Sequence, residues 1–271
     1  MRKFFLLCAM AVLGFGQANA QLDEDEYGFF NHVALGVSAG TDGIGFQVAA
    51  PLGQCLALRA GYSFFPKLKY NKEINLGNDV AFVKSKVDLE GKLNFNQVSV
   101  LVDYYPFTSS SFRVTAGAYF GDGKILTVSN AEPFIKEAYW ETAGIQLGKG
   151  NAVSDKYTVV SDAQGNVNID LKVNSFRPYL GIGFGRAVPR KRVGLSFDLG
   201  VQIWGSPEVQ TNLMYFDGNK GDFVTRYEKV NKNRITRDDK DDYKDIRDAI
   251  KTIEKVGVYP VLTLRLNGRL F

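Results

Sequence analysis

The chain has 271 residues, of which 45% are hydrophobic and 23% are charged, and its formal net charge is +4. So small an excess of positive charge excludes an electrostatic case for nucleic-acid binding, which calls for a strongly basic surface. With only two cysteines, Cys8 and Cys55, the sequence also excludes a small scaffold stapled by several disulfides.

The first twenty residues have the pattern of a secretory signal. Arg2 and Lys3 precede an apolar run over residues 4–15, and Ala18-Asn19-Ala20 offers the small-x-small pattern that signal peptidase accepts. The run is too short to cross a bilayer as a helix, which needs roughly 20 residues. We therefore expect residues 1–20 to be a cleaved signal peptide and residues 21–271 to form one domain. Cleavage would lower the net charge from +4 to +2 and leave Cys55 without a partner for an intrachain disulfide.

Alternation of apolar with other residues, which is typical of β-strands, recurs in eight stretches of the remaining chain. They cover residues 33–39, 44–50, 56–64, 98–104, 112–120, 180–184, 193–203 and 262–270. Short turns at 51–54, 106–111 and 187–192 alternate with long segments at 67–93, 122–174 and 206–257, and only the first turn, at 40–43, departs from this rule. An even number of strands with short turns at one end and long loops at the other is typical of outer-membrane barrels. The sequence therefore predicts an all-β fold, a single antiparallel transmembrane barrel of eight strands with long extracellular loops.

Two of the long segments predict structure of their own. Residues 157–173 indicate a hairpin around "DAQGN", placed above the membrane because its first arm is too short to cross. Residues 236–256 predict one loop helix, with apolar residues at three- and four-residue spacing up to Ile253. Loop aromatics, including Phe134, Tyr139 and Trp140, could form a recognition surface or pack over the barrel mouth, and the sequence leaves both readings open.

The two faces of the predicted strands differ in a way that favours a membrane barrel over a soluble one. The apolar phase carries no charged residue, as expected where Lys or Arg at the bilayer midplane costs about 2–4 kcal/mol. The opposite phase is rich in glycine, which weakens a solvent-facing strand but suits the narrow interior of an eight-stranded barrel. This phase also carries the charged residues that we predict to form a polar network in the lumen: Arg59, Asp103, Arg113, Arg177, Asp198, Arg265 and Arg269.

Asp198 is the most informative of these residues, because it lies in the middle of the apolar stretch "VGLSFDLGVQIWG". In phase with Ser196, Gly200 and Gln202, it should point into the lumen and pair with arginine, since a buried carboxylate needs a partner. Asp103 and Arg113 flank the 106–111 turn at matching distances and are expected to be cross-strand neighbours. We interpret these charges as a structural plug of salt bridges, with a conducting polar path as the alternative.

The strands and turns resemble the eight-stranded outer-membrane β-barrel superfamily, the OmpA-like and OmpW-like barrels. The resemblance depends on "LVDYYPF" (101–107), "FRVTAGAYF" (112–120), "PYLGIGFGRAV" (178–188), "GLSFDLGVQIWGSPEV" (194–209) and "YPVLTLRLNGRLF" (259–271). It implies an outer-membrane location, contact with outer-membrane lipid and lipopolysaccharide, and insertion by the barrel assembly machinery, which reads a terminal aromatic residue. Phe271 supplies that residue, although it is out of phase with the apolar positions from Leu262 to Leu270.

No motif in the sequence predicts catalysis, a cofactor or a metal. "GIGFG" (181–185) lies inside a strand pattern with no helix after it, so a dinucleotide loop is excluded. The acidic residues between Asp238 and Asp245 lack the spacing of an EF-hand loop. We therefore predict a monomeric membrane protein with a structural or surface-interaction role. Two alternatives remain: a narrow pore or OmpW-like transporter of small molecules, and a lipid A-modifying enzyme, for which His32 would be the only histidine base.

Overall fold

The computed structural model describes residues 27–66, 69–75, 86–133, 137–139, 144–147, 157–235 and 244–270. The predicted signal peptide, Phe271, Phe134, Trp140 and the acidic residues 238–242 therefore lie outside the described residues.

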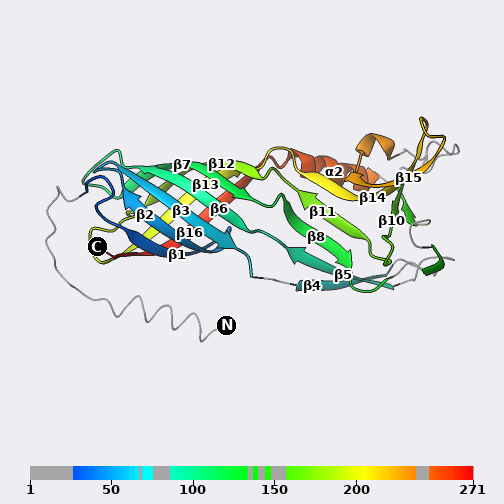
Figure 1. Cartoon of the computed structure of the whole chain (residues 1–271), viewed down its shortest axis with the longest axis horizontal. Coiled ribbons are helices and arrows are strands. Elements are labelled where there is room, and N and C mark those ends of the chain that lie inside the picture. The colour runs from blue at the N-terminus through cyan, green and yellow to red at the C-terminus, as the bar shows by residue number, and fades with distance from the viewer. Residues whose placement is uncertain are drawn as a thin grey trace.

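Eight strands form a closed antiparallel barrel, at the left of Figure 1. They are β1 (Ala34–Gly40), β2 (Gly43–Pro51), β3 (Leu56–Phe64), β6 (Gln97–Tyr104), β7 (Phe112–Gly121), β12 (Phe176–Phe184), β13 (Val193–Ile203) and β16 (Val258–Arg269). The barrel closes because β1 pairs with β2 on one edge and with β16 on the other. Each of the eight predicted stretches overlaps one of these strands, so the predicted eight-stranded all-β barrel is confirmed, as is the resemblance at the level of the fold.

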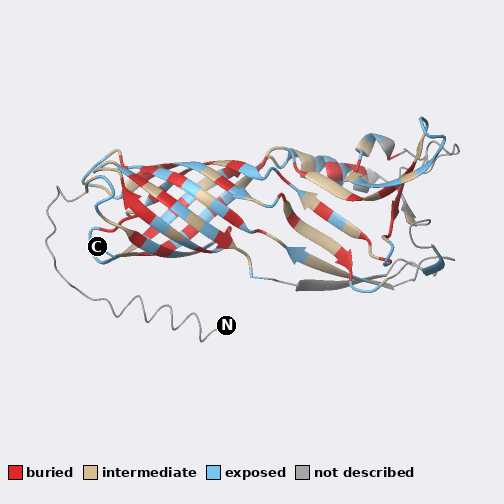
Figure 2. Cartoon of the chain, viewed as in Figure 1, coloured by how far each residue is buried: buried red, intermediate tan, exposed pale blue. Residues whose placement is uncertain are grey.

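Side chains along the barrel strands alternate between an exposed apolar outer face and a buried inner face, which Figure 2 shows as a checkerboard. On β13, for example, Leu199 is 47% exposed while its neighbour Asp198 is 1% exposed. The outer face of the barrel is thus a continuous apolar surface, which we call the apolar belt. Its residues include Leu35, Val37, Phe46, Val48, Val100, Leu180, Ile182, Leu195, Leu199, Leu262 and Leu264.

The long segments between barrel strands are not irregular loops, because most of their described residues form a second sheet. This distal sheet, at the right of Figure 1, contains β4 (Lys69–Asn75), β5 (Lys86–Leu93), β8 (Lys124–Asn130), β9 (Gly144–Gln146), β10 (Tyr157–Val160), β11 (Asn168–Lys172), β14 (Glu208–Asp217) and β15 (Asp222–Lys229). The ladder between β7 and β12 runs on into it, since Gly121 N–H donates to Ser175 O and Val173 N–H donates to Gly123 O, at 3.1 and 2.8 Å. Apart from β10 and β11, which lie within the predicted hairpin at 157–173, sequence alternation missed these strands, because they lie beyond the apolar belt and carry mixed polar residues.

The predicted hairpin at 157–173 is wrong in its pairing. Its turn is present, with Gly165 N–H donating to Asp162 O at 3.0 Å, but β10 and β11 do not pair with each other. Both pair instead with the same edge of β14, where Thr158 lies opposite Met214 and Asp170 lies opposite Gln210. The two arms are therefore one interrupted strand, because β14 offers an edge long enough for both.

The predicted helix is confirmed as α2 (Lys244–Lys255) over the part of 236–256 that the structure describes. Ile250 of α2 packs in a core with Leu213, Tyr215 and Val230, so the helix covers the distal sheet. Two single-turn 3-10 helices, Glu137–Tyr139 and Lys232–Arg234, complete the described elements. Among the described residues, no helix has both the length and the apolar composition needed to cross a membrane.

Candidate functional site

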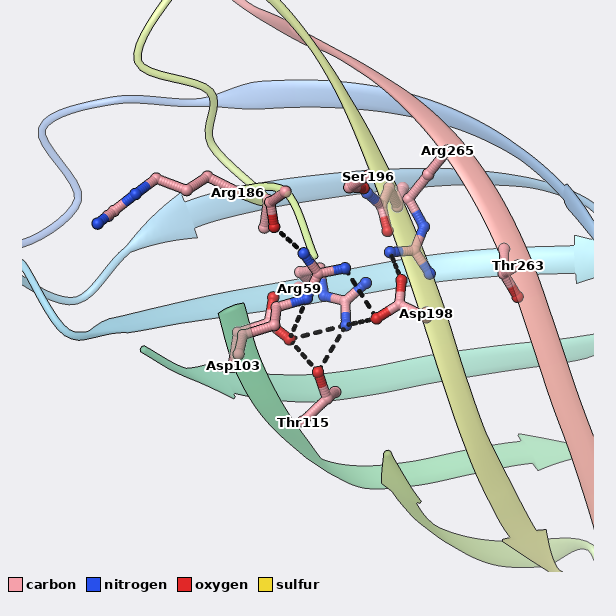
Figure 3. Close-up of polar contacts among 12 residues, drawn as sticks. Arg59, Asp103, Thr115, Arg186, Ser196, Asp198, Thr263 and Arg265 are labelled. Atoms are coloured by element: carbon pink, nitrogen blue, oxygen red, sulfur yellow. Dashed lines mark hydrogen bonds and ion pairs between the residues drawn. The ribbon is translucent and has the colours of Figure 1, made fainter. Parts of the chain in front are cut away.

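Five of the seven charged residues predicted to face the lumen meet in one place, which we call the lumen charge cluster (Figure 3). They are Arg59 on β3, Asp103 on β6, Arg113 on β7, Asp198 on β13 and Arg265 on β16. All five are buried, although each comes from a different strand. The cluster therefore links five of the eight barrel strands through side chains.

Asp198 is the centre of the lumen charge cluster. Its Oδ1 accepts a hydrogen bond from Arg113 Nη2 at 2.8 Å and lies 3.5 Å from Arg59 Nη2. Its Oδ2 accepts a hydrogen bond from Arg265 Nη1. One carboxylate thus pairs with three guanidinium groups from three other strands.

Asp103 holds the other side of the cluster. Its Oδ1 accepts hydrogen bonds from Arg59 Nη2 at 2.7 Å and from Thr115 Oγ1 at 2.6 Å. Arg113 Nε lies 3.5 Å from the same oxygen, so the predicted proximity of Asp103 and Arg113 is confirmed. The expected register is wrong, however, because Asp103 lies opposite Thr115. The last pair before the turn is Tyr104 with Val114, so the turn is centred on Ser109 and residue 103 pairs with residue 115.

Glycines leave the space that the cluster needs. Gly183 lies opposite Asp198, and a Cβ there would be 2.8 Å from Asp198 Oδ1 and 3.0 Å from Arg113 Cζ. A Cβ on Gly181 or Gly200 would come within 2.5 or 2.4 Å of the Tyr179 hydroxyl. The glycine-rich inner phase therefore accommodates both arginine and tyrosine side chains.

Three arginines and two aspartates give the cluster a formal charge of +1. Removing charges from water is costly. The attraction within a buried ion pair offsets this cost only where the two groups are well aligned and hydrogen-bonded. Deleting one partner from such a group is far more costly than replacing the whole group, because the remaining charges stay buried without compensation. Chemically, the arrangement cross-links strands and fills the lumen.

The other two predicted residues, Arg177 and Arg269, lie outside the cluster. Arg177 is buried near the distal end of the lumen, where its Nη2 lies 3.4 Å from Asp122 O and its guanidinium lies 5.5 Å from the Phe95 ring centroid. Arg269 is half-buried at the opposite end of β16, and its backbone N–H donates to Arg192 O at 2.8 Å.

Sequence reasoning placed Ser196 and Gln202 on the inner face but predicted no hydrogen bonds among the neutral residues of the lumen. Asn267 Nδ2 donates to Ser196 Oγ at 3.0 Å, and Gln47 Nε2 donates to Asn267 Oδ1 at 2.8 Å. Nearer the distal end, Thr263 Oγ1 donates to Asp42 Oδ1 at 3.1 Å. These residues, apart from Asp42 in the first turn, share the inward phase of the charged ones, so phase was the signal that could have found them.

Aromatic residues close the distal end of the lumen. Trp204 and Tyr259 stack with ring centroids 4.5 Å apart, and Phe95 lies 6.0 and 5.5 Å from them. Phe65 packs on Phe95 at 5.8 Å. These four residues, which we call the neck, are located where the barrel passes into the distal sheet.

The other end of the barrel, with the short turns, is closed by the turn after β12. Ala187 and Val188 of this turn are buried in the barrel mouth. Ala187 N–H donates to the Tyr105 hydroxyl at 2.9 Å, and the Tyr27 hydroxyl donates to Val188 O at 3.0 Å. The turn, the charge cluster and the neck thus fill the lumen at successive levels.

The distal sheet has a polar cluster of its own around the buried Asp170. Its Oδ1 accepts a hydrogen bond from Thr127 Oγ1 at 2.5 Å, and its Oδ2 lies 2.9 Å from Lys124 Nζ and accepts from the Tyr227 hydroxyl. Burial alone would raise the pKa of Asp170, but these hydrogen bonds and the Lys124 charge outweigh it and hold the pKa below its ordinary value.

A groove of about 810 Å³ lies between β15 and α2, and its lining includes Lys229, Lys232, Lys251 and Glu254. Glu254 pairs with both Lys229 and Lys232, and Lys251 pairs with Asp248 at 3.2 Å. Two of the lysines that line the groove are therefore paired with one glutamate of the same lining.

Three other residues that the sequence analysis named lie apart from these clusters. His32, half-buried at the short-turn end, has its ring 6.1 Å from that of Tyr27. Cys55 is a half-buried free thiol beside a short turn. Tyr139 belongs to the 3-10 helix Glu137–Tyr139 beyond the barrel.

Two crystal structures of Acinetobacter baumannii proteins are similar to most of the chain. CarO has 19% sequence identity and a TM-score of 0.48, and the match covers 89% of this chain and 99% of CarO. CarO2 has 18% identity and a TM-score of 0.44, and the match covers 88% of this chain and 98% of CarO2. No family model and no curated protein sequence matches this chain.

Proposed function

We propose that residues 21–271 are a monomeric integral outer-membrane barrel with a filled lumen, which holds the distal sheet at the cell surface in a structural or surface-interaction role. The observation that carries the proposal is the inverted distribution of polarity: leucines such as Leu199 are exposed, while Asp198 and its arginine partners are buried. Such a barrel is stable only where apolar solvent covers its outer face.

The orientation follows from the lengths of the connections. Outer-membrane barrels place short turns in the periplasm and long segments outside the cell. The short-turn end would then face the periplasm, and the distal sheet would face the medium. The belt would contact outer-membrane lipid and lipopolysaccharide, export would use the signal peptide at residues 1–20, and the barrel assembly machinery would insert the chain.

Membrane placement is tested by labelling single cysteines at positions 199 and 200 with a fluorophore and adding a lipid-soluble quencher. Cys55 would first be replaced by serine so that each variant carries one site in the mature chain. We expect quenching at 199 and little at 200. The reverse result would contradict the proposal.

The filled lumen is tested by reconstitution of the purified protein in planar bilayers. Side chains from five strands cross the lumen at the charge cluster, so we expect no steady conductance. A reproducible conductance from protein that migrates as a folded barrel would favour the narrow pore or OmpW-like transporter instead.

A non-enzymatic role is tested by mass spectrometry of lipid A from cells with and without the protein. We expect identical acyl patterns. A difference abolished by His32→Ala, but not by the matched surface change Gln54→Ala at the same end, would identify a lipid A-modifying enzyme.

A further inference from the structure

The short-turn end carries a group of cations outside the lumen charge cluster. We call it the basic rim, and it consists of Arg186, Arg190, Lys191, Arg192 and Arg269. The described residues at this end, 27–34, 51–57, 104–112, 185–193 and 267–270, contain no Asp or Glu. The basic rim is therefore a concentration of one sign of charge.

Two arginines of the basic rim are held in place by the neighbouring turn at residues 106–111. Arg186 Nη2 and Arg190 Nη2 both donate to Thr108 O, at 2.7 and 2.6 Å. The Arg186 guanidinium also lies 4.8 Å from the Tyr105 ring centroid and 5.2 Å from that of Tyr27. Two cations thus converge on one carbonyl, and burial together with the charge of Arg190 lowers the pKa of Arg186.

The turn that carries the basic rim is buried at its start and exposed at its end. Arg190, Lys191 and Arg192 are exposed, whereas Ala187 and Val188 are buried in the barrel mouth. The carbonyl of Arg192 accepts the backbone N–H of Arg269, which joins the turn to the end of β16. A short, anchored turn loses little conformational freedom when its side chains bind a ligand.

The basic rim directly borders the apolar belt. Val193 and Leu195 continue the chain from Arg192 with exposed side chains, and Leu270 follows Arg269. Phe107, next to Thr108, whose carbonyl accepts the two arginine hydrogen bonds, is 60% exposed at the same end. In a bilayer, charges at the edge of an apolar surface lie at the depth of the lipid headgroups.

From this arrangement we propose that the basic rim binds the phosphate of an anionic phospholipid in the leaflet that faces the short turns. Arginine matches phosphate with two parallel hydrogen bonds, and lysine adds a point charge. The acyl chains of the same lipid would lie on the adjoining apolar belt. This inference rests on the proposed membrane placement and adds a defined lipid class to it.

The test is native mass spectrometry of the purified full-length protein in detergent, titrated with phosphatidylglycerol or with phosphatidylethanolamine of the same acyl chains. We expect the folded protein to retain phosphatidylglycerol at about tenfold lower concentration, because basic clusters beside a membrane favour anionic lipid. The triple variant Arg190→Gln, Lys191→Gln and Arg192→Gln should lose this preference. The matched control Lys229→Gln, Lys232→Gln and Lys251→Gln, which removes three charges from the distal sheet, should keep it.

Equal retention of the two lipids by the folded protein, or a preference that survives the triple variant, would overturn the proposal. The sequence offers one competing occupant, the acidic run Asp23 to Glu26 just before Tyr27. If phosphatidylglycerol preference appears only after these four residues are changed to Asn and Gln, that run occupies the basic rim and the lipid proposal fails. Quenching of a label at position 199 is independent of these results, so the membrane placement is judged separately.

Discussion

Several strands of the distal sheet, such as β8 and β11, come directly after or before a barrel strand in the chain, yet the two regions distribute polar and apolar side chains in opposite ways. In the barrel, charged side chains are inside and leucines are outside. In the distal sheet, Tyr157, Val159 and Leu213 are buried in a conventional apolar core beneath α2. The hydrogen-bond ladders are continuous from one region to the other, so backbone pairing does not decide which face is apolar.

This difference shows that the solvent around a strand determines which of its two faces carries the apolar side chains. Where acyl chains cover a strand, apolar residues are stable outside and polar groups must pair inside. Where water covers it, the hydrophobic effect drives the apolar residues inward. The change occurs at the neck, where Trp204 follows β13 and precedes β14.

The largest effect is expected from Asp198→Asn in the lumen charge cluster. The change leaves Arg59, Arg113 and Arg265 buried without their shared carboxylate, so the free energy of unfolding should fall by about 3–5 kcal/mol. Urea titration in detergent, followed by the gel mobility of the folded barrel, measures it. Asp248→Asn, which removes an exposed ion pair on α2, should cost less than about 0.5 kcal/mol, and equal costs would show that the lumen is solvated.

Leu213→Ala should remove a similar amount of free energy, but from the distal sheet alone. Leu213 is fully buried in its core, and deleting such a side chain costs about 2–5 kcal/mol. Hydrogen exchange should accelerate in β10, β14 and α2 while β13 stays protected. Leu264→Ala, on the exposed belt of β16, should have a smaller effect. A loss of protection across both regions would mean that they unfold as one unit.

Leu199→Lys should destabilise the barrel by about 2–4 kcal/mol, because it places a charge at the middle of the belt. The matched change Phe223→Lys, on the exposed face of β15 in the distal sheet, should stay within about 0.5 kcal/mol. The measurement is urea unfolding in lipid vesicles. Comparable costs for the two lysines would contradict a lipid-covered belt.

The smallest effect is a pH dependence confined to the distal sheet. Because the pKa of Asp170 is held below its ordinary value of 3.8, its charged form contributes stability that is complete above about pH 4. This stability is lost as the pH falls through the lower folded-state pKa. Asp170→Asn should cost about 1–3 kcal/mol at neutral pH and flatten the acid dependence of hydrogen exchange in β11. An unchanged acid profile in the variant would assign the dependence to another group.

Sequence alone located the barrel strands and the face of each, because one residue out of phase would put a charge into lipid. The same strictness placed Asp198 and its arginine partners on the inner face. The alternation could not separate Arg177 and Arg269 from the cluster, because it indicates which face of the strand a residue occupies and not its height along the lumen.

What only the tertiary structure decided is the set of contacts made between distant segments. In the distal sheet, β10 and β11 pair with one edge of β14. No local pattern in residues 157–173 predicts this pairing, because β14 lies elsewhere in the sequence. The triple pairing of Asp198 likewise depends on the positions of four strands, β3, β7, β13 and β16, around a closed barrel. Alternation is a property of one strand and its solvent, whereas register and closure are properties of all the strands together.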